Sequence, residues 1–350
     1  MASSKYLRRR IVVAALLVLA IALAVALANR GQLRGVYDQL LGRDFTGPGT
    51  GSVTLTIVPG ESGVGVAADL EKLGVVKNSD VAYRLIIAED SIFYPGSYRL
   101  LRGMSSQQAL DAIKNPQSLL VDRVTIKEGL RLQTTLKQLA TATGKPLSDF
   151  IAAAGNLSDL GIPTSAPNAD GYLFPATYAF DPNLSAKAIL KQMVARTYQE
   201  LDHYGVAVAD RHRVLTLASI IQKEARQTQD FYKVSRVFTN RLKIGMKLQS
   251  DATVSYGSGG NTVTTTAAER ADGNGYNTYV HAGLPIGPIG GPGSLAIDAA
   301  LHPVPGSWIY FCAINLETGE TVFSTTAAEH SAAVAKWRAW MQANPGWNGN

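Results

Sequence analysis

The sequence predicts an α+β fold, and three observations carry this prediction. Helical and strand-like segments are mixed along the chain without a regular strand–helix–strand alternation. A pattern of strand, glycine turn and two helices occurs twice in the first half. Two strand-like runs near the C-terminus, SWIYFCAIN and TVFST, flank the turn LETGE. With 46% hydrophobic and 17% charged residues, the chain has the composition of a folded protein with buried cores.

The N-terminal region contains the most apolar segment of the chain. Residues 11–28, IVVAALLVLAIALAVALA, are uncharged and about long enough to cross a bilayer. Basic residues in the preceding segment, 1–10, favour keeping that end in the cytoplasm. A cleaved signal peptide is the alternative, because A-x-A patterns such as Ala26 to Ala28 are present. The length of the apolar run favours an uncleaved transmembrane helix, so we expect a single-pass protein of the cell membrane with most of the chain on the outer face.

Residues 29–52 are predicted to be a flexible tether. The segment ends in TGPGTGS, a stretch rich in glycine, serine, threonine and proline. A flexible chain of this length spans only ~25–30 Å on average. The folded part of the protein is therefore expected to begin at Val53 and to work close to the membrane.

Residues 53–184 contain an imperfect internal repeat. The segment VTLTIVPG from Val53 resembles RVTIKEG from Arg123, and a shift of 69 positions aligns Gly60 with Gly129 and Leu70 with Leu139. A second similarity, Ser97-Tyr98 with Thr177-Tyr178, has a shift of 80, so an insertion of 11 residues separates the two. Duplicated small units of this kind suit a binding or spacer module, and chance similarity of common patterns is the alternative.

Residues 185–340 are predicted to form a second, mixed α+β domain, followed by a tail at 341–350. Helical sequence runs to Tyr204, and further helices are expected at about 211–228, 230–242 and 327–342. Asp230 is the expected N-cap of the helix at 230–242 and Gly245 its stop signal. A loop dense in glycine and proline, GLPIGPIGGPG at 283–293, either lines a groove as a stiff wall or serves as a passive connection.

Glu224 is the candidate catalytic residue. On a helix that turns by about 100° per residue, Glu224 falls in the same apolar stripe as Leu217 and Ile221, whereas Ser219 and Lys223 fall on the opposite side. Burial disfavours the charged form of a carboxyl group and raises its pKa, which suits an acid that protonates an ether-like leaving oxygen. A structural ion pair with Arg236 or Arg241 is the alternative.

Other chemistries lack support in the sequence. The five histidines show no H-E-x-x-H spacing, and there is no P-loop, G-x-S-x-G elbow or dinucleotide fingerprint, so we expect neither a metal nor a cofactor. The one cysteine, Cys312, lies in an apolar run and cannot form an internal disulfide. The net charge of +6 comes from scattered basic residues, which argues against nucleic acid as a partner.

Several ordered motifs resemble the endolytic murein transglycosylases of the YceG/MltG family. They are GYLFPATY at 171–178, LASIIQKEA at 217–225, VFTNRLKIGMKLQSDATVSYG at 237–257, YNTY at 276–279 and the loop at 283–293 followed by AALHP. The N-terminal anchor matches the family's arrangement, and the repeated region resembles its LysM-like part with weaker motif support. Three positions depart from the family's pattern: Gln222 replaces the first acid of E-K-E, Asp170 stands for the usual acid before GYLFP, and Ala252 replaces a proline.

The resemblance implies a membrane-anchored lytic transglycosylase. Glu224 would protonate the glycosidic oxygen between N-acetylmuramic acid and N-acetylglucosamine, and its carboxylate would then take the proton of the muramic C6 hydroxyl, leaving a 1,6-anhydro end. Residues that could hydrogen-bond or stack on sugars complete the expected site: Gln249, Asp251, Thr253, Tyr256, Tyr276, Asn277 and Tyr279.

The resemblance also implies the partners and leaves two other functions open. The expected partners are peptidoglycan strands, the cell membrane and the cell-wall synthesis machinery, and cleavage of new strands would limit their length. One alternative is a non-catalytic peptidoglycan-binding scaffold. The other is a muramidase-type hydrolase, in which Asp251 would be the second carboxylate that glycoside hydrolysis ordinarily requires.

Overall fold

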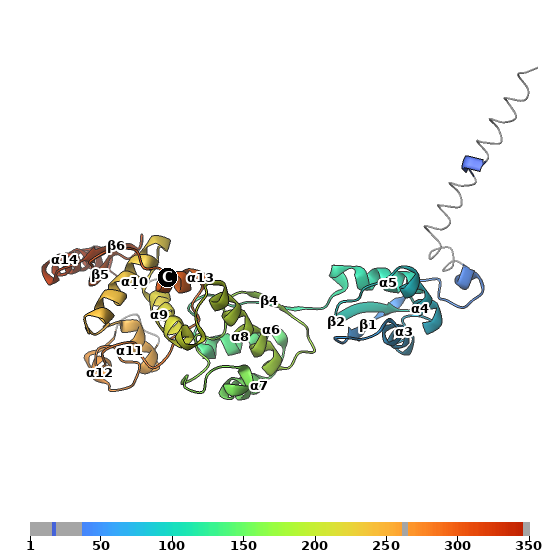
Figure 1. The fold of residues 1–350 in the computed structure, drawn as a ribbon, viewed down its shortest axis with the longest axis horizontal. Coiled ribbons are helices and arrows are strands. Elements are labelled where there is room, and N and C mark those ends of the chain that lie inside the picture. Colours follow the sequence, from blue (N-terminus) through green and yellow to red (C-terminus); the bar gives the residue numbers. More distant parts are fainter. Residues whose placement is uncertain (1–15, 19–36, 261–264, 346–350) are drawn as a thin grey trace, which may run out of the picture. The chain divides into compact units, whose positions relative to one another are not determined.

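A computed structural model of the chain describes residues 16–18, 37–260 and 265–345, which form two compact units (Figure 1). The first unit contains the described residues up to Val121 together with Asp181–Asn183, and the second contains Asp122–Phe180 and the described residues from Leu184 onward. We predicted a boundary after residue 184. The chain divides at residue 121 instead, because the buried side chains of the second copy of the repeat share one hydrophobic core with the C-terminal half.

The membrane segment predicted at residues 11–28 lies outside the described residues, apart from 16–18, which are helical. Within the part of the chain that the structure describes, no helix is both long and apolar enough to cross a bilayer.

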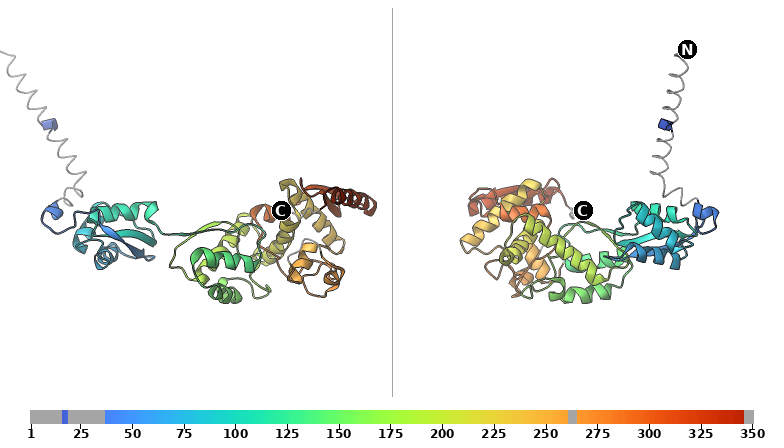
Figure 2. Two further views of the ribbon diagram at one scale, coloured as in Figure 1. Left: turned by 180° about the vertical axis from the view of Figure 1, so that it is seen from behind. Right: turned by 45° about the vertical axis from the view of Figure 1, so that its right-hand side comes forward.

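The first unit is a two-stranded antiparallel sheet packed against helices (Figure 1 and Figure 2). Strands β1 and β2 pair from Thr50 opposite Arg102 to Ile57 opposite Gly96. The inward side chains of the sheet and helices form one core that includes Leu55, which is 1% exposed. The elements are β1 (Thr50–Ile57), α3 (Gly63–Lys72), α4 (Ser79–Ala88), β2 (Gly96–Arg102), α5 (Ser106–Lys114) and η1 (Pro116–Ser118).

The described part of the predicted tether packs on this unit rather than hanging free. Lys77 donates a hydrogen bond from Nζ to the carbonyl oxygen of Gly42 at 2.7 Å. Asp44 is buried and accepts two hydrogen bonds from Ser106, one from the backbone N–H at 2.9 Å and one from Oγ at 3.0 Å. Asp44 thus supplies an acceptor at the start of α5, which is why polar sequence here is ordered and why the prediction of a flexible tether through residue 52 was wrong for residues 37–52.

The second copy of the repeat opens the second unit. It consists of β3 (Asp122–Thr125), α6 (Leu132–Thr143), α7 (Leu147–Gly155), η2 (Ser158–Leu160) and β4 (Thr177–Phe180). Strands β3 and β4 pair antiparallel, with Asp122 opposite Phe180. Both copies therefore have the order strand, helix, helix, strand, of which the sequence predicts the first strand and the two helices. The LysM-like character of the repeat stays a prediction.

The rest of the second unit is helical up to a C-terminal hairpin. The hairpin and final helix are confirmed close to their predicted positions, and the fold is mixed α+β, with three two-stranded sheets among the described residues. The elements are α8 (Ala186–His203), η3 (Val208–Asp210), α9 (Arg211–Glu224), α10 (Thr228–Lys243), α11 (Asp251–Gly257), α12 (Ala267–Ala271), α13 (Ser294–Leu301), β5 (Tyr310–Asn315), β6 (Glu320–Ser324) and α14 (Ala327–Ala343).

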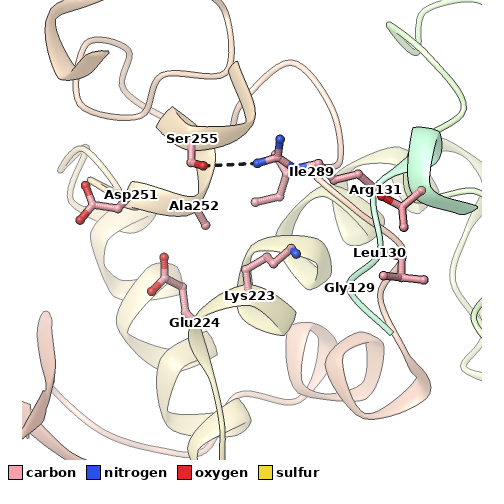
Figure 3. Close-up of a pocket in the computed structure, with 10 residues that line it drawn as sticks. Gly129, Leu130, Arg131, Lys223, Glu224, Asp251, Ala252, Ser255 and Ile289 are labelled. Atoms are coloured by element: carbon pink, nitrogen blue, oxygen red, sulfur yellow. Dashed lines mark hydrogen bonds between the residues drawn. The ribbon is translucent and has the colours of Figure 1, made fainter. Parts of the chain in front are cut away.

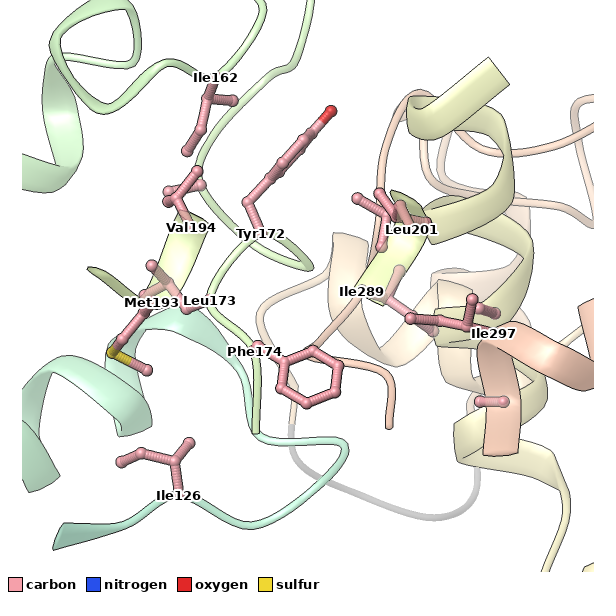
Figure 4. Packing of buried hydrophobic residues seen from close by; sticks show 14 of the residues in the cluster. Ile126, Ile162, Tyr172, Leu173, Phe174, Met193, Val194, Leu201, Ile289 and Ile297 are labelled. Carbon is pink, nitrogen blue, oxygen red and sulfur yellow. The ribbon is translucent and has the colours of Figure 1, made fainter. Parts of the chain in front are cut away.

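Helix α9 is the central element of the second unit and is buried on all sides over residues 214–221. The helical-wheel prediction of a polar face was therefore wrong: Ser219 is 1% exposed and accepts a hydrogen bond from the backbone N–H of Ile289 at 3.0 Å. Figure 4 shows the core around this region, in which side chains of the second copy, of α8 and of the glycine- and proline-rich loop interdigitate. A buried polar residue can face such a core when its hydrogen bonds are satisfied.

The ends of α9 and α10 differ in detail from the prediction. Helix α9 stops at Glu224 rather than near residue 228, so Glu224 is its last residue. Helix α10 begins at Thr228 with Gln227 as N-cap, and Asp230 lies buried in its first turn instead of capping it. Gly245 follows the helix with φ of 69°, a left-handed conformation that glycine adopts readily, as the stop signal predicted.

Candidate active site

A cleft of about 420 Å³ opens at the C-terminal end of α9 (Figure 3). Helix α9, the start of α11, the segment before α6 and the loop at 283–293 all contribute to its walls. The lining residues are Gly129, Leu130, Arg131, Thr134, Lys223, Glu224, Asp251, Ala252, Ser255 and Ile289.

The glycine- and proline-rich loop forms one wall of this cleft. The backbone of Gly129 donates to the carbonyl oxygen of Gly291 at 2.7 Å, and Gly291 donates to that of Leu130 at 2.9 Å. A side chain at Gly290 would place its first carbon 2.9 Å from the carbonyl oxygen of Gly129, which is closer than side-chain carbons pack. Glycine is therefore needed where the two backbones meet, and Gln222 supports the same loop by accepting from Gly293 N–H at 3.0 Å.

Glu224 presents its carboxyl group to the cleft, where it is half-buried. It accepts a hydrogen bond from Ser250 Oγ at 2.5 Å and one from the backbone N–H of Ala252. Burial raises the pKa of Glu224, and the negative charge of Asp251 raises it further, while the Ser250 hydrogen bond, Arg241 and the Ala252 hydrogen bond oppose the rise. The environment thus favours the protonated acid and still offers donors to the carboxylate.

The alternative of a structural ion pair for Glu224 is not what the described residues show. Arg236 donates instead to the carbonyl oxygens of Pro303 and Val304, at 2.8 and 2.5 Å. Arg241 donates to the carbonyl oxygens of Leu248 and Ile309, at 2.7 and 2.6 Å, and joins β5 to the body of the unit. Both arginines bind backbone carbonyl oxygens rather than the Glu224 carboxyl group, so Glu224 can act as an acid.

Asp251 is the second carboxylate of the cleft, and its surroundings differ from those of Glu224. It accepts hydrogen bonds from Thr265 Oγ1 at 2.5 Å and from Arg270 Nε at 3.2 Å, the latter as an ion pair. Tyr279 also hydrogen-bonds Asp251, and the Arg270 guanidinium lies over the Tyr279 ring at 5.3 Å from its centroid. Asp251 is thus held by an ion pair and hydrogen bonds beside Glu224, whose pKa burial raises, and this difference in surroundings suits two roles for the two carboxyl groups.

Asp170 is buried behind the cleft, in the connection that the insertion lengthens. Its Oδ1 accepts from the backbone N–H of Leu132 at 2.8 Å, and its Oδ2 accepts from the Tyr256 hydroxyl at 2.8 Å. Burial raises the pKa of Asp170 to about 6, against the effect of both hydrogen bonds and of the charges on Arg131 and Lys223. Sequence reasoning noted Asp170 only as a departure from a motif, although its place before GYLFP was a usable signal.

Five other predicted sugar-binding residues fall into three groups. Tyr256 and Tyr276 lie ring to ring, with centroids 4.6 Å apart, and Asn168 donates to both hydroxyls. Thr253 and Asn277 are fully buried and hydrogen-bond within the protein, so they shape the site without reaching a ligand in this structure. Gln249 is exposed, has a left-handed φ of 49° and does not line the cleft.

Sequence reasoning missed several residues that line or support the site. Lys223 and Arg131 line the cleft, although the helical wheel placed Lys223 opposite Glu224. Ser250 was overlooked because a serine before an acid is indistinguishable from a surface residue until the partner Glu224 is known. No group of three or more histidine, cysteine, aspartate or glutamate residues that could hold a metal occurs within the described ranges.

Comparison with known proteins identifies close relatives. Residues 55–336 match the model of the YceG-like family. An endolytic murein transglycosylase of Bacillus subtilis (strain 168) is 31% identical over 308 residues, covering 82% of this chain and 85% of that protein. An endolytic murein transglycosylase of Streptococcus pneumoniae (strain D39) is 26% identical over 324 residues, covering 81% of this chain and 58% of that protein. The crystal structure of a YceG-like protein from Listeria monocytogenes, 28% identical, superposes with a TM-score of 0.54, covering 81% of this chain and 99% of the other.

Proposed function

Because this chain belongs to the YceG-like family, we propose that it is an endolytic murein transglycosylase, a lyase that cleaves the bond between N-acetylmuramic acid and N-acetylglucosamine inside peptidoglycan strands. The observation that carries the proposal is the position of Glu224 at the cleft, with a pKa raised by burial. A scaffold that only bound glycan would have no use for such an acid, and the names of the relatives support the enzyme.

In the proposed reaction Glu224 acts twice. Its proton goes to the glycosidic oxygen as the bond between that oxygen and the muramic C1 breaks. The Glu224 carboxylate then accepts the proton of the muramic C6 hydroxyl as the C6 oxygen bonds to C1, which closes the 1,6-anhydro ring and restores the acid. No water is consumed. The Ser250 hydroxyl and the Ala252 N–H stabilise the carboxylate between the two steps, when it carries the charge.

A muramidase is the second candidate, and Asp251 is the observation that favours it. Glycoside hydrolysis ordinarily uses two carboxylates, and Asp251 lines the same cleft as Glu224. The ion pair with Arg270 and the hydrogen bond from Thr265 favour an electrostatic role for Asp251 instead, because both bind the carboxylate oxygen Oδ1 within the protein.

The test is mass spectrometry of the fragments released from purified peptidoglycan. The protein should begin at residue 37, because the segment from 37 to 49 packs on the first unit. Anhydro-ended fragments from the wild type and none from Glu224→Gln support the lyase and its acid. Reducing-end fragments that disappear in Asp251→Asn establish the muramidase instead, and no products from a folded wild type favour the scaffold.

We further propose that residues 11–28 anchor the protein in the cell membrane, that the enzyme acts on strands close to it, and that cleavage there limits strand length alongside the synthesis machinery. Gly42 and Asp44 are hydrogen-bonded to the first unit, which shortens the stretch that can act as a tether and supports action close to the membrane. A flexible insert placed between residues 28 and 37 should change the length distribution of glycan strands in cells, and an unchanged distribution would contradict the proximity proposal.

A further inference from the structure

Two cationic side chains line the cleft on the side away from Asp251 (Figure 3). Lys223 precedes the catalytic Glu224 on α9, and Arg131 comes from the segment just before α6. The mechanism above uses neither of them. The cleft therefore carries carboxyl groups toward one end and positive charge toward the other.

Among the described residues, neither Arg131 nor Lys223 has an ion-pair partner that would explain its position. Arg131 donates from one terminal nitrogen to Ser255 Oγ at 3.3 Å and lies over the Tyr256 ring at 5.2 Å from the centroid. Lys223 makes no ion pair with any residue that the structure describes. Asp170 is a buried acid whose pKa the charges on both cations lower, but its two oxygens already accept from Leu132 and Tyr256.

The positive charges of Lys223 and Arg131 repel each other. Burial lowers the pKa of Lys223, and the charge on Arg131 lowers it further, with Asp170 opposing. Like charges brought together in a partly buried cleft destabilise the empty protein, and an anion placed between them would remove that cost. A guanidinium beside an ammonium is a common receptor for a carboxylate.

Arg131 also stands where the first copy of the repeat has a helix cap. The 69-residue shift aligns Arg131 with Ser62, whose hydroxyl caps α3 by accepting from Gly65 N–H at 3.2 Å. Arg131 makes no such bond at the start of α6, and Asp170 supplies the acceptor for Leu132 instead. Loss of a side-chain N-cap destabilises a helix, so helix capping does not explain the cation at this position.

We propose that Arg131 and Lys223 form a subsite that binds a carboxylate of the glycan strand beside the bond that Glu224 cleaves. The inference rests on the proposed function, because it takes the muramic residue as the sugar in the cleft. That sugar carries a lactyl ether whose carboxylate is free when the stem peptide is absent. When the peptide is present, the lactyl group is an amide, and the glutamate of the peptide supplies the carboxylate instead.

Binding of defined glycan fragments to the full chain carrying Glu224→Gln tests the subsite without turnover. Peptide-free and peptide-bearing fragments are each prepared with free carboxylates and with the carboxylates converted to carboxamides. Lys223→Gln and Arg131→Ser are added singly, the serine restoring the residue of the first copy and its cap. Lys191→Gln, an exposed lysine of α8 that does not line the cleft, is the matched control.

The expected result is a loss of affinity on the order of 10-fold for a carboxylate fragment with either substitution, and no change for its carboxamide or in the control. Arg131→Lys should retain most of the affinity because it retains the charge. A loss confined to the peptide-free fragment identifies the lactyl carboxylate, and a loss confined to the peptide-bearing fragment identifies the peptide. Equal affinities for carboxylates and carboxamides, or no binding of either, would overturn the subsite. Failure of the proposed function is a separate result, seen in the products of the wild type.

Discussion

The two copies of the repeat have the same order of elements, but only the second copy belongs to the unit that contains the cleft. In the first copy, α4 ends at Ala88 and β2 begins at Gly96, so the connection is short. In the second, α7 ends at Gly155 and β4 begins only at Thr177. The longer connection carries Asp170 and the GYLFP segment, and it packs into the catalytic unit.

The repeat supplies the same elements twice, and the two copies differ in the connection between the second helix and the closing strand. The short connection of the first copy exposes Ile92 and Tyr94, at 75% and 73%. The long connection of the second buries Asp170 and Tyr172, and the Tyr172 hydroxyl donates to His212 Nδ1 at 2.8 Å while His212 donates from Nε2 to the carbonyl oxygen of Ile286 at 3.0 Å. Residues 156–176 thereby tie the second copy to α9 and to the loop at 283–293.

The same contrast appears in the cores. The buried side chains of the first copy form a cluster of their own, whereas those of the second belong to one cluster with α8, α9 and α13. Damage to equivalent core positions should therefore affect activity in one copy and not in the other.

Truncation of the aligned leucines, Leu70 and Leu139, should give the largest effect. Both are 0% exposed, and replacing either by alanine should lower the free energy of unfolding of its own unit by ~2–5 kcal/mol through the cavity that remains. Only Leu139→Ala should also lower the rate of cleavage of short soluble glycans, because its core reaches α9. Urea denaturation and turnover of both variants test this, and equal losses of activity would break the contrast between the copies.

Asp170 should make the stability of the second unit depend on pH. Its pKa of about 6 in the folded protein lies above its ordinary value of 3.8, so the folded state keeps a proton that the unfolded chain releases earlier. The free energy of unfolding should fall as pH rises from about 4 to about 6, by up to roughly 3 kcal/mol, and Asp170→Asn should remove that component. The measurement is urea denaturation of both proteins at several pH values. If the free energies of unfolding of wild type and Asp170→Asn changed equally between about pH 4 and about pH 6, the raised pKa of Asp170 would be contradicted.

Substitution of Asp170 should also lower activity, whereas substitution of an aspartate in the equivalent connection of the first copy should not. Asp170→Asn leaves one of the donors, Leu132 N–H or the Tyr256 hydroxyl, poorly matched and should lower kcat/KM by about 10-fold or more through misplacement of Arg131 and Tyr256. Asp90 is the matched control, an exposed aspartate in the connection of the first copy whose φ of 47° suits asparagine equally well. Asp90→Asn should leave the rate unchanged.

Helices and strands could be predicted from the sequence better than the contacts between residues far apart in the chain. Periodicity and turn residues located the repeat, the hairpin and the helix that carries Glu224, because these depend on local patterns. The helical wheel failed for Ser219, because it assumes that one face of a helix meets solvent, and α9 is buried on all sides over residues 214–221. Ser250 and Arg131 reach the site through long-range packing, which no spacing in the sequence encodes.

Substitution of Ser250 should give the smallest effect. Ser250 hydrogen-bonds Glu224, which lies outside both copies of the repeat, so this substitution tests the acid without altering the repeat. Ser250→Ala removes the hydroxyl that donates to Glu224 Oε1 at 2.5 Å, and that hydrogen bond favours the carboxylate. The pKa of Glu224 should therefore rise further above its ordinary value. Since the rate depends on the protonated acid, it falls as pH rises through this pKa, and the descending limb of kcat/KM should move to higher pH in the variant. The maximal rate should drop by less than about 10-fold, because one hydrogen bond is lost and Ala252 still donates to Glu224.

Thr253→Ser is the control, because it keeps a hydroxyl at a buried position three residues after Ser250. It should leave the descending limb of kcat/KM at the pH of the wild type. A limb that moved to lower pH in Ser250→Ala, or did not move, would mean that Glu224 is not the group whose proton the reaction uses.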